Sequence, residues 1–339
     1  MISTPTSATE ETSQSSAPVK SFVLTVACCW AVLGLAAWPL AQSRQIPAQI
    51  AAPVALAFLT EISFYLLPGF RRLREWIVAT YRPVQVAAAM AFTALIPYLV
   101  FAIPTAHFGW RELATLAALV TAVAFCYLRP VRHPQLAILR DIAFLFLLAA
   151  AILSGIFKWI YPAPIAKLPM EVLGHLTLVR CAVVAVLLVK RTDRIVFGFI
   201  PTLREIRIGT LWAMACTAVA FPFGLMLGQV HLASHPVHPL PALLQLLGIF
   251  WFVALSEEFF FRSLLQQWLT SWTGSTTAAL IIASCVYGLS HLKFPNWQFA
   301  ILTTILGLFC GMAFQQARSM RASMITHTLV AAVFRLLLS

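Results

Sequence analysis

Three charged residues stand inside one long apolar stretch of the chain. Glu257, Glu258 and Arg262 lie in the run LLGIFWFVALSEEFFFRSLLQQWL. A charged side chain at the centre of a membrane helix costs about 2.5–3.5 kcal/mol on insertion scales. The three charges therefore need partners, water or a catalytic role, because passive membrane anchoring explains none of them.

Helical spacing separates the two glutamates. Glu258 and Arg262 are four residues apart and share a helix face, whereas Glu257 points about 100° away from Glu258. For Glu258 and Arg262 we favour a buried ion pair that fixes the helix against its neighbours. Glu257 has no local partner, which leaves it available as a base or as a ligand beside a polar cavity.

Two histidines occupy apolar helical runs further along the chain. His291 ends AALIIASCVYGLSH, with Tyr287 one turn before it, and His327 lies in SMITHTLVAAVF. A lone histidine in such a run is more often a hydrogen-bonded core residue than a ligand. Three ionisable centres on three successive polar-marked helices favour a common site with Glu257.

A glutamate and two histidines can hydrolyse a carbonyl compound in two ways. The carboxylate can take a proton from water while a histidine orients that water or stabilises the oxyanion. Alternatively, Glu257, His291 and His327 could hold a divalent metal such as zinc, whose bound water is the nucleophile. Neither H-E-x-x-H nor G-x-S-x-G occurs, so neither a zincin nor an ordinary serine hydrolase is indicated. The cofactor stays open between a metal and none.

Composition fixes the class of protein. Of 339 residues, 61% are hydrophobic and 10% are charged, which is more apolar surface than one soluble core could bury. We expect an all-α, polytopic transmembrane bundle of about eleven spans. The expected spans are 22–41, 48–68, 84–104, 112–128, 142–161, 171–189, 209–230, 242–269, 277–291, 297–316 and 322–338.

The distribution of basic residues suggests an orientation. They gather in the connections with Arg71 to Arg82, Arg129 to Arg140 and Lys190 to Arg207, which the positive-inside rule places in the cytoplasm. We therefore expect an amino terminus in the cytoplasm of a bacterial inner membrane. The basic surplus then needs no nucleic-acid partner, and membrane lipids are the expected surroundings.

Three segments are expected along the chain. Residues 1–20 are rich in Ser and Thr and indicate a disordered tail. Residues 21–230 carry spans with scattered polar residues and form an accessory transmembrane region. Residues 240–339 hold the interior ionisable groups, after a proline-rich loop at 231–241.

Other polar residues receive structural interpretations. His231, His235 and His238 could bind a metal but fit an ordinary surface loop better. Glu171, His175 and Arg180 share one span and could line a cavity. Glu61 could carry protons or pair with an arginine, although an interhelical hydrogen bond accounts for it more simply. The seven cysteines lie in apolar runs and are expected to pack.

The motif residues carry a family resemblance. Glu257-Glu258-Phe-Phe-Phe-Arg262, Tyr287-Gly-Leu-Ser-His291 and His327-Thr-Leu-Val-Ala331 resemble the CPBP family of intramembrane proteases, which includes CAAX proteases and bacteriocin-processing proteins. The resemblance covers roughly 240–335. It implies an intramembrane endopeptidase acting on a membrane-embedded or membrane-delivered peptide, in which Glu257 activates water with help from His291. It further implies that His327 binds the water or the oxyanion, and that Glu258 and Arg262 shape the site.

One departure from the family pattern bears on activity. Ala331 stands where the family commonly has Asn, so an oxyanion donor is missing or comes from elsewhere, for example from Asn296. Loss of one such donor costs about 10²–10³ in rate. The alternative to a protease is a transporter or a non-catalytic scaffold whose buried charges line a cavity, although no symmetric pair of broken helices supports a transporter.

Overall fold

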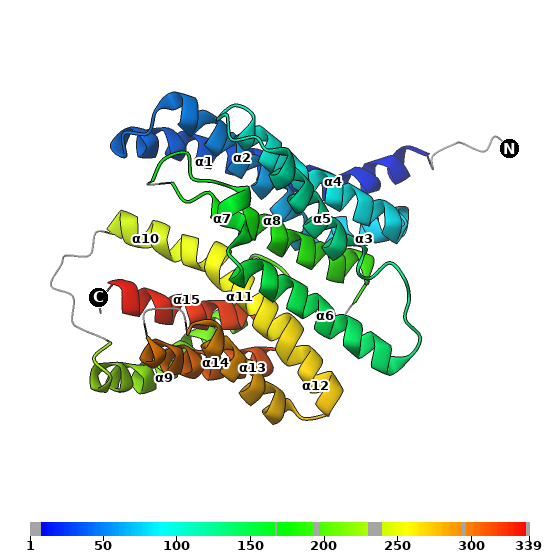
Figure 1. The fold of residues 1–339 in the computed structure, drawn as a ribbon. Helices are drawn as coiled ribbons and strands as arrows, with labels where there is room; N and C mark the ends of the chain where they lie inside the picture. Colours follow the sequence, from blue (N-terminus) through cyan, green and yellow to red (C-terminus); the bar gives the residue numbers. More distant parts are fainter. Residues whose placement is uncertain are drawn as a thin grey trace. The chain divides into compact units, whose positions relative to one another are not determined.

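The structure is a computed structural model in which residues 8–166, 168–192, 195, 197–229, 239–292 and 296–336 are described. Throughout this described part the chain is helical and has no strands, as expected (Figure 1). Packing divides the chain into two compact units, Met1–Asp193 and Arg194–Ser339. Each unit is considered separately below.

The first unit is built from long apolar helices and short connecting turns. Its elements are α1 (Ala8–Ser43), α2 (Ala48–Leu66), η1 (Leu67–Gly69), α3 (Arg71–Thr80), α4 (Pro83–Ala102), α5 (Trp110–Phe125), α6 (Pro134–Leu153), α7 (Ile156–Ile160), α8 (Glu171–Val184) and η2 (Ala185–Val189). A break at Gly155, which adopts a left-handed φ of 70°, separates α6 from α7. The span expected at 142–161 therefore ends at Leu153 and starts earlier, at Pro134.

The second unit contains all the motif residues. Its elements are α9 (Leu203–Met226), α10 (Pro239–Gly248), η3 (Ile249–Ala254), α11 (Leu255–Glu258), η4 (Phe259–Gln266), α12 (Gln267–Thr273), α13 (Thr276–Ser290), α14 (Trp297–Ala317) and α15 (Met320–Leu336). The unit includes α9, which packs on α14 and α15. In the first unit, α1 starts at Ala8, inside the segment expected to be a tail.

Among the described residues, eight helices are long and apolar enough to cross a membrane. The chain is therefore a multi-pass integral membrane protein, but the expected count of about eleven spans is not confirmed. The other three expected spans also form helices, but α5, α13 and α15 have only 16, 15 and 17 residues. These three helices are shorter than the ~20 residues that a perpendicular span needs.

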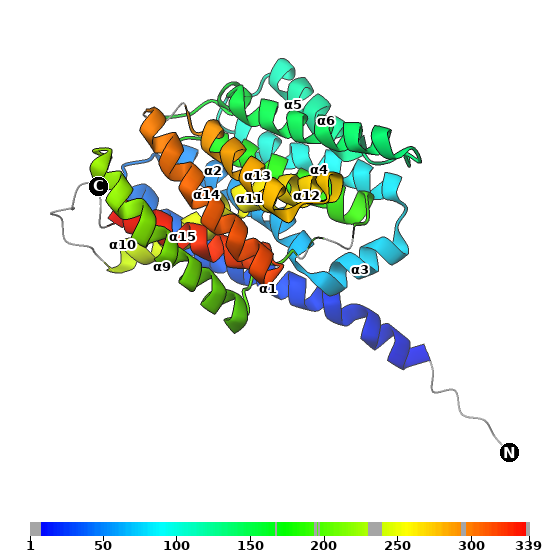
Figure 2. The same ribbon diagram turned by 90° about the horizontal axis from the view of Figure 1, so that it is seen from below.

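Close helix approaches hold the second unit together. A Cβ added at Gly288 of α13 would lie 2.7 Å from the Ala300 carbonyl oxygen of α14, and one at Gly209 of α9 would lie 2.6 Å from the Ala322 carbonyl of α15. Small residues let membrane helices pack at such short range. Figures 1 and 2 both show α13 and α14 side by side. These contacts bring α13 and α15 within reach of the glutamate helix.

The two glutamates lie in a short α-helical segment between two π-helical stretches. The segment α11 spans four residues, with η3 before it and η4 after it. Such wide turns are rare and frequently occur at functional sites. The local helical geometry of the glutamate pair therefore differs from a uniform α-helix, although the expected contact between Glu258 and Arg262 still forms.

Candidate active site

Glu258 is held on every side by polar partners. Arg262 Nε donates to its Oε2 at 3.1 Å, Ser323 Oγ donates to the same oxygen, and His327 Nδ1 donates to Oε1 at 2.8 Å. The side chains of Glu258 and Arg262 are 1% and 0% exposed. The expected buried ion pair is confirmed. Because both carboxylate oxygens are engaged, Glu258 is suited to position its neighbours rather than to contact substrate.

The network continues away from Glu258 through Arg262. One terminal nitrogen of Arg262 donates to Gln266 Oε1 at 3.2 Å, and Gln266 Nε2 donates to the Gly311 carbonyl at 3.3 Å. The guanidinium carbon also lies 5.7 Å from the centre of the Tyr287 ring, a cation–π distance. Arg262 thus ties the glutamate helix to α13 and α14.

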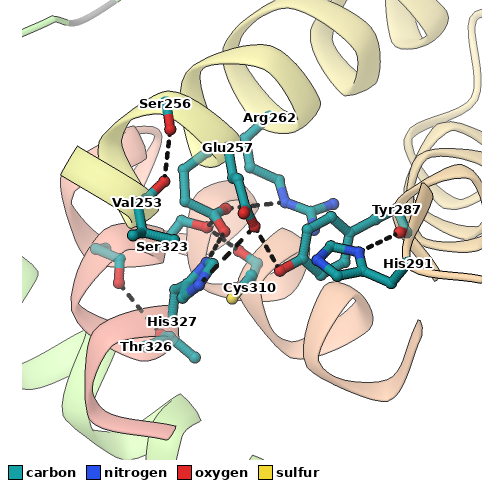
Figure 3. A network of polar contacts seen from close by, with 12 residues as sticks. Val253, Ser256, Glu257, Arg262, Tyr287, His291, Cys310, Ser323, Thr326 and His327 are labelled. Atoms are coloured by element: carbon teal, nitrogen blue, oxygen red, sulfur yellow. Dashed lines mark hydrogen bonds and ion pairs between the residues drawn. The ribbon is translucent and has the colours of Figure 1, made fainter. Parts of the chain in front are cut away.

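Glu257 differs from Glu258 in exposure and in its partners. Its side chain is 28% exposed, and its Oε2 accepts a 2.7 Å hydrogen bond from the Tyr287 hydroxyl. The same oxygen lies 3.9 Å from His327 Nε2. A partly exposed carboxylate that faces a tyrosine and a histidine can accept a proton from a bound molecule. Figure 3 shows Glu257 between Tyr287 and His327.

The bonding of His327 fixes its tautomer. A carboxylate can only accept, so Nδ1 carries the proton that is donated to Glu258 Oε1. In the neutral ring, Nε2 then presents its lone pair toward Glu257. The 3.9 Å between Nε2 and Oε2 is too long for a direct hydrogen bond, but one water can donate to both atoms across that distance.

His291 is oriented by the end of its own helix. It caps α13, and its Nδ1 lies 2.9 Å from the Tyr287 carbonyl and 3.1 Å from Ser290 Oγ. Because a carbonyl only accepts, Nδ1 carries the proton and Nε2 has the lone pair in the neutral ring. The imidazole stacks edge-on against Tyr287 with ring centres 4.8 Å apart (Figure 3). Tyr287 is therefore the common neighbour of Glu257 and His291.

Glu257, His291 and His327 come from three different helical segments. Two of them have an end near the site, because α13 stops at Ser290, directly before His291, and α15 starts only at Met320. The ring of Tyr287 lies 4.8 Å from His291 and 6.3 Å from His327. The expected motif residues thus gather around one tyrosine.

A metal was the alternative use of these side chains. Among the described residues, the metal-ligating groups that lie within 4.8 Å of one another are Glu258, Cys310 and His327, not the expected set with Glu257 and His291. This group fits a cation poorly, because the Arg262 guanidinium already neutralises Glu258 and because His327 turns a protonated nitrogen toward it. We derive no catalytic step through a metal.

Two contributors to the network were not singled out from the sequence. Ser323 binds both Glu258 and the Cys310 carbonyl, and Gln266 extends the Arg262 network. Their spacing could have indicated them, because Ser323 lies one turn before His327 and Gln266 one turn after Arg262, each on the same helix face as the motif residue. Cys310 is fully buried, in agreement with its expected packing role.

The two residues discussed as oxyanion donors have different positions. Asn296 caps α14, and its Oδ1 accepts from the Phe299 backbone N–H at 3.1 Å. Ala331 lies in α15 one turn after His327 and is partly exposed. An Asn at position 331 would therefore stand on the helix face that carries His327.

The remaining polar candidates have structural surroundings. Arg180 Nε donates to Glu61 Oε1 at 2.8 Å in the first unit, which confirms the pairing interpretation for Glu61. His175 packs edge-on against Phe157, while Glu171 lies 3.9 Å from the Lys158 ammonium. The loop with His231, His235 and His238 lies outside the described residues.

Comparison with known proteins places the motif-bearing region. No curated protein and no solved structure matches the chain. Residues 239–333 match the family model described as type II CAAX prenyl endopeptidase Rce1-like. The match begins at the start of α10, covers every motif residue and ends within α15. It favours a protease over the transporter or scaffold alternative. The segment 239–333 is therefore similar to the CAAX-protease domain of the CPBP family.

Proposed function

We propose that this protein is an intramembrane endopeptidase of the CAAX-protease type and that Glu257 is its general base. The observation that carries the proposal is the contrast within the glutamate pair. Glu258 is buried and fully bonded, whereas Glu257 is 28% exposed with its Oε2 3.9 Å from His327 Nε2. That pair of atoms is spaced to hold one water between two acceptors.

The proposed reaction is hydrolysis of a peptide bond. Water held between Glu257 and His327 gives a proton to Glu257 as its oxygen attacks the peptide carbonyl carbon. Glu257 then passes that proton to the leaving amide nitrogen, and the carbon–nitrogen bond breaks. The products are a new carboxylic acid and a free amine.

The neighbouring residues have positioning roles in this proposal. Glu258 holds the Nδ1 proton of His327 and thereby directs Nε2 toward the water. Arg262 and Ser323 keep Glu258 in place. His291, fixed by the Tyr287 carbonyl, contacts the substrate or the water from the α13 side. Hydrolysis inside the bilayer suits a substrate that is itself embedded in or delivered by the membrane.

The test is cleavage by purified protein in lipid nanodiscs. The substrates are a membrane-anchored peptide with a prenylated carboxyl-terminal cysteine and the same peptide without the prenyl group. Glu257→Gln and His291→Ala should each abolish cleavage while the protein still inserts and unfolds at the parental temperature. Parental cleavage rates in both variants would overturn the assignment.

A chelator arm accompanies this assay. If water is activated by Glu257 alone, cleavage persists after exhaustive treatment with a membrane-compatible chelator. Loss of cleavage that zinc restores would contradict the metal-free step proposed above, even if Glu257→Gln is inactive. The variants test the protease assignment and the chelator tests the metal-free mechanism, so each can fail without the other.

A further inference from the structure

The first unit contains an apolar cavity that is distant in sequence from the motif segment. Its volume is about 400 Å³, and its walls come from α2, η1, α3, α4, α8 and η2. Trp76, Ile77, Tyr81, Met90 and Leu188 are among the lining residues. A cavity of this size falls within the range of small-ligand sites.

The inner wall of the cavity carries a charged group that is already satisfied. Arg180 lines the cavity and binds Glu61 through Nε at 2.8 Å and through Nη2 at 3.2 Å. Its Nη1 donates to Thr93 Oγ1, another lining atom, at 3.1 Å. The guanidinium charge is neutralised by Glu61, so this wall does not require an anionic group from an occupant. The lining therefore suits a hydrocarbon chain.

The cavity opens along the exposed side of α4. Gln85 and Ala89 line it and are themselves exposed, and Tyr81 is 41% exposed. Trp76 and Tyr81 pack edge-on at 5.7 Å between ring centres. Aromatic residues of this kind concentrate where a membrane meets water. This end of the cavity is thus suited to the region just below a lipid headgroup.

Three arginines are hydrogen-bonded to residues that line this end of the cavity or lie close to such residues in the chain. Arg72 lies one helical turn before Trp76, the Arg82 backbone N–H donates to Gln85 Oε1 at 2.8 Å, and Arg191 donates to the Tyr81 carbonyl at 2.8 Å. All three arginines are exposed. Arg71 is different, because Glu75 forms an ion pair with it at 2.8 Å. Among the described residues, no acidic side chain forms an ion pair with these three arginines, each of which is hydrogen-bonded to a lining residue or lies one helical turn from one.

We propose that this cavity binds one acyl chain of an anionic phospholipid, with the lipid phosphate at Arg72, Arg82 and Arg191. The apolar walls take the chain and the arginines complement the headgroup charge. Trp76 and Tyr81 occupy the level between chain and headgroup. This lipid site lies in the unit without the protease motif and is independent of the proposed hydrolysis.

The experiment uses the full chain in phosphatidylcholine nanodiscs that contain a small fraction of photoactivatable phosphatidylglycerol, with the reactive group on the acyl chain. Crosslinked peptides are mapped by mass spectrometry in the absence of any peptide substrate. Crosslinks should concentrate on α3, α4 and η2. A photoactivatable phosphatidylcholine with the same chain should label these helices much less.

Matched variants on α4 test whether the cavity is the site. Ala88 and Ala89 are neighbouring exposed residues, but only Ala89 is in the cavity lining. Ala89→Phe should reduce the crosslinking several-fold, whereas Ala88→Phe should leave it unchanged. Ala89→Leu, with a smaller side chain, serves if the Phe variant does not fold. Equal crosslinking in the Ala88 and Ala89 variants would overturn the proposal.

Charge variants test the headgroup contact. One arginine near an anionic lipid surface changes binding by about fivefold, so Arg72→Gln and Arg82→Gln should each reduce phosphatidylglycerol labelling by about that factor. Arg132→Gln, an exposed arginine in another connection, is the control. Labelling that is equal for the two lipids, or insensitive to Arg72 and Arg82, would overturn the anionic preference. Neither result depends on peptidase activity.

Discussion

Each of the two units contains a fully buried glutamate that pairs with a buried arginine, but the surroundings of the two pairs differ. Glu61 receives two bonds from Arg180, through Nε and Nη2, and a third from Thr177 at 3.0 Å. Glu258 accepts one hydrogen bond from Arg262 and two more, from Ser323 and His327. In the first pair the carboxylate is bound by its partner on both oxygens, while in the second one oxygen orients a histidine.

The contrast shows what separates a structural ion pair from one that supports a site. Buried glutamate–arginine pairs are weak evidence for function, because burial demands pairing wherever such charges occur. The second pair is distinguished by its neighbour, since Glu257 stands beside it, partly exposed and bonded to Tyr287. A histidine fixed by the paired glutamate and an adjacent accessible carboxylate make a site, and the pair alone does not.

The largest expected difference is between Glu257→Gln and Glu61→Gln. Loss of the general base should reduce kcat by about 10²–10⁴, with the midpoint of thermal unfolding unchanged. Glu61→Gln leaves the buried Arg180 without a counter-charge, so it should lower the unfolding midpoint while the folded fraction keeps its specific activity. Peptide cleavage and thermal unfolding in the same nanodiscs measure both. A Glu61→Gln protein that is stable but inactive would contradict the structural role assigned to Glu61.

Replacing each pair with apolar residues sharpens the comparison. Breaking one partner of a buried ion pair costs about 3–5 kcal/mol, whereas replacing both with residues of similar volume is often neutral. Glu61→Met/Arg180→Met should therefore regain both stability and activity relative to Glu61→Met. Glu258→Met/Arg262→Met should regain stability but stay inactive, because His327 has lost its acceptor.

Tyr287→Phe should have an intermediate effect. The hydroxyl donates to Glu257 at 2.7 Å, and a hydrogen bond to a charged group contributes about 1.5–3 kcal/mol. Since about 1.4 kcal/mol corresponds to a factor of ten in rate, kcat should fall by roughly 10- to 100-fold. Tyr98→Phe, which removes a 3.1 Å contact with Gly109 in the first unit, is the control. A matching loss of activity in the control would show that the effect is not specific to the site.

Ala331→Asn is expected to have the smallest effect. It places an amide on the His327 face of α15, where the family commonly has one. Cleavage should rise by no more than about 10-fold, less than the 10²–10³ that an established oxyanion donor contributes. Steady-state kinetics with the prenylated peptide measure this change. A loss of activity in the variant would show that position 331 does not face the reacting carbonyl.

Part of the fold could be read from apolar run lengths. All eleven expected spans correspond to helices, but three of them are too short to count as spans and one is displaced toward Pro134. Hydropathy locates apolar residues and does not locate the turn at Gly155 or the early starts of capped helices. The packing of α9 against α14 and α15 likewise leaves no mark in composition.

By itself, the sequence determined the membrane class, the all-helical fold and the residues of the candidate site. Charges in apolar runs are costly, so their positions alone mark where partners or chemistry must be. The roles within the set depended on tertiary structure. Ser323 and the shared position of Tyr287 come from helices far apart along the chain, and only packing decides that Glu258 is enclosed while Glu257 stays accessible.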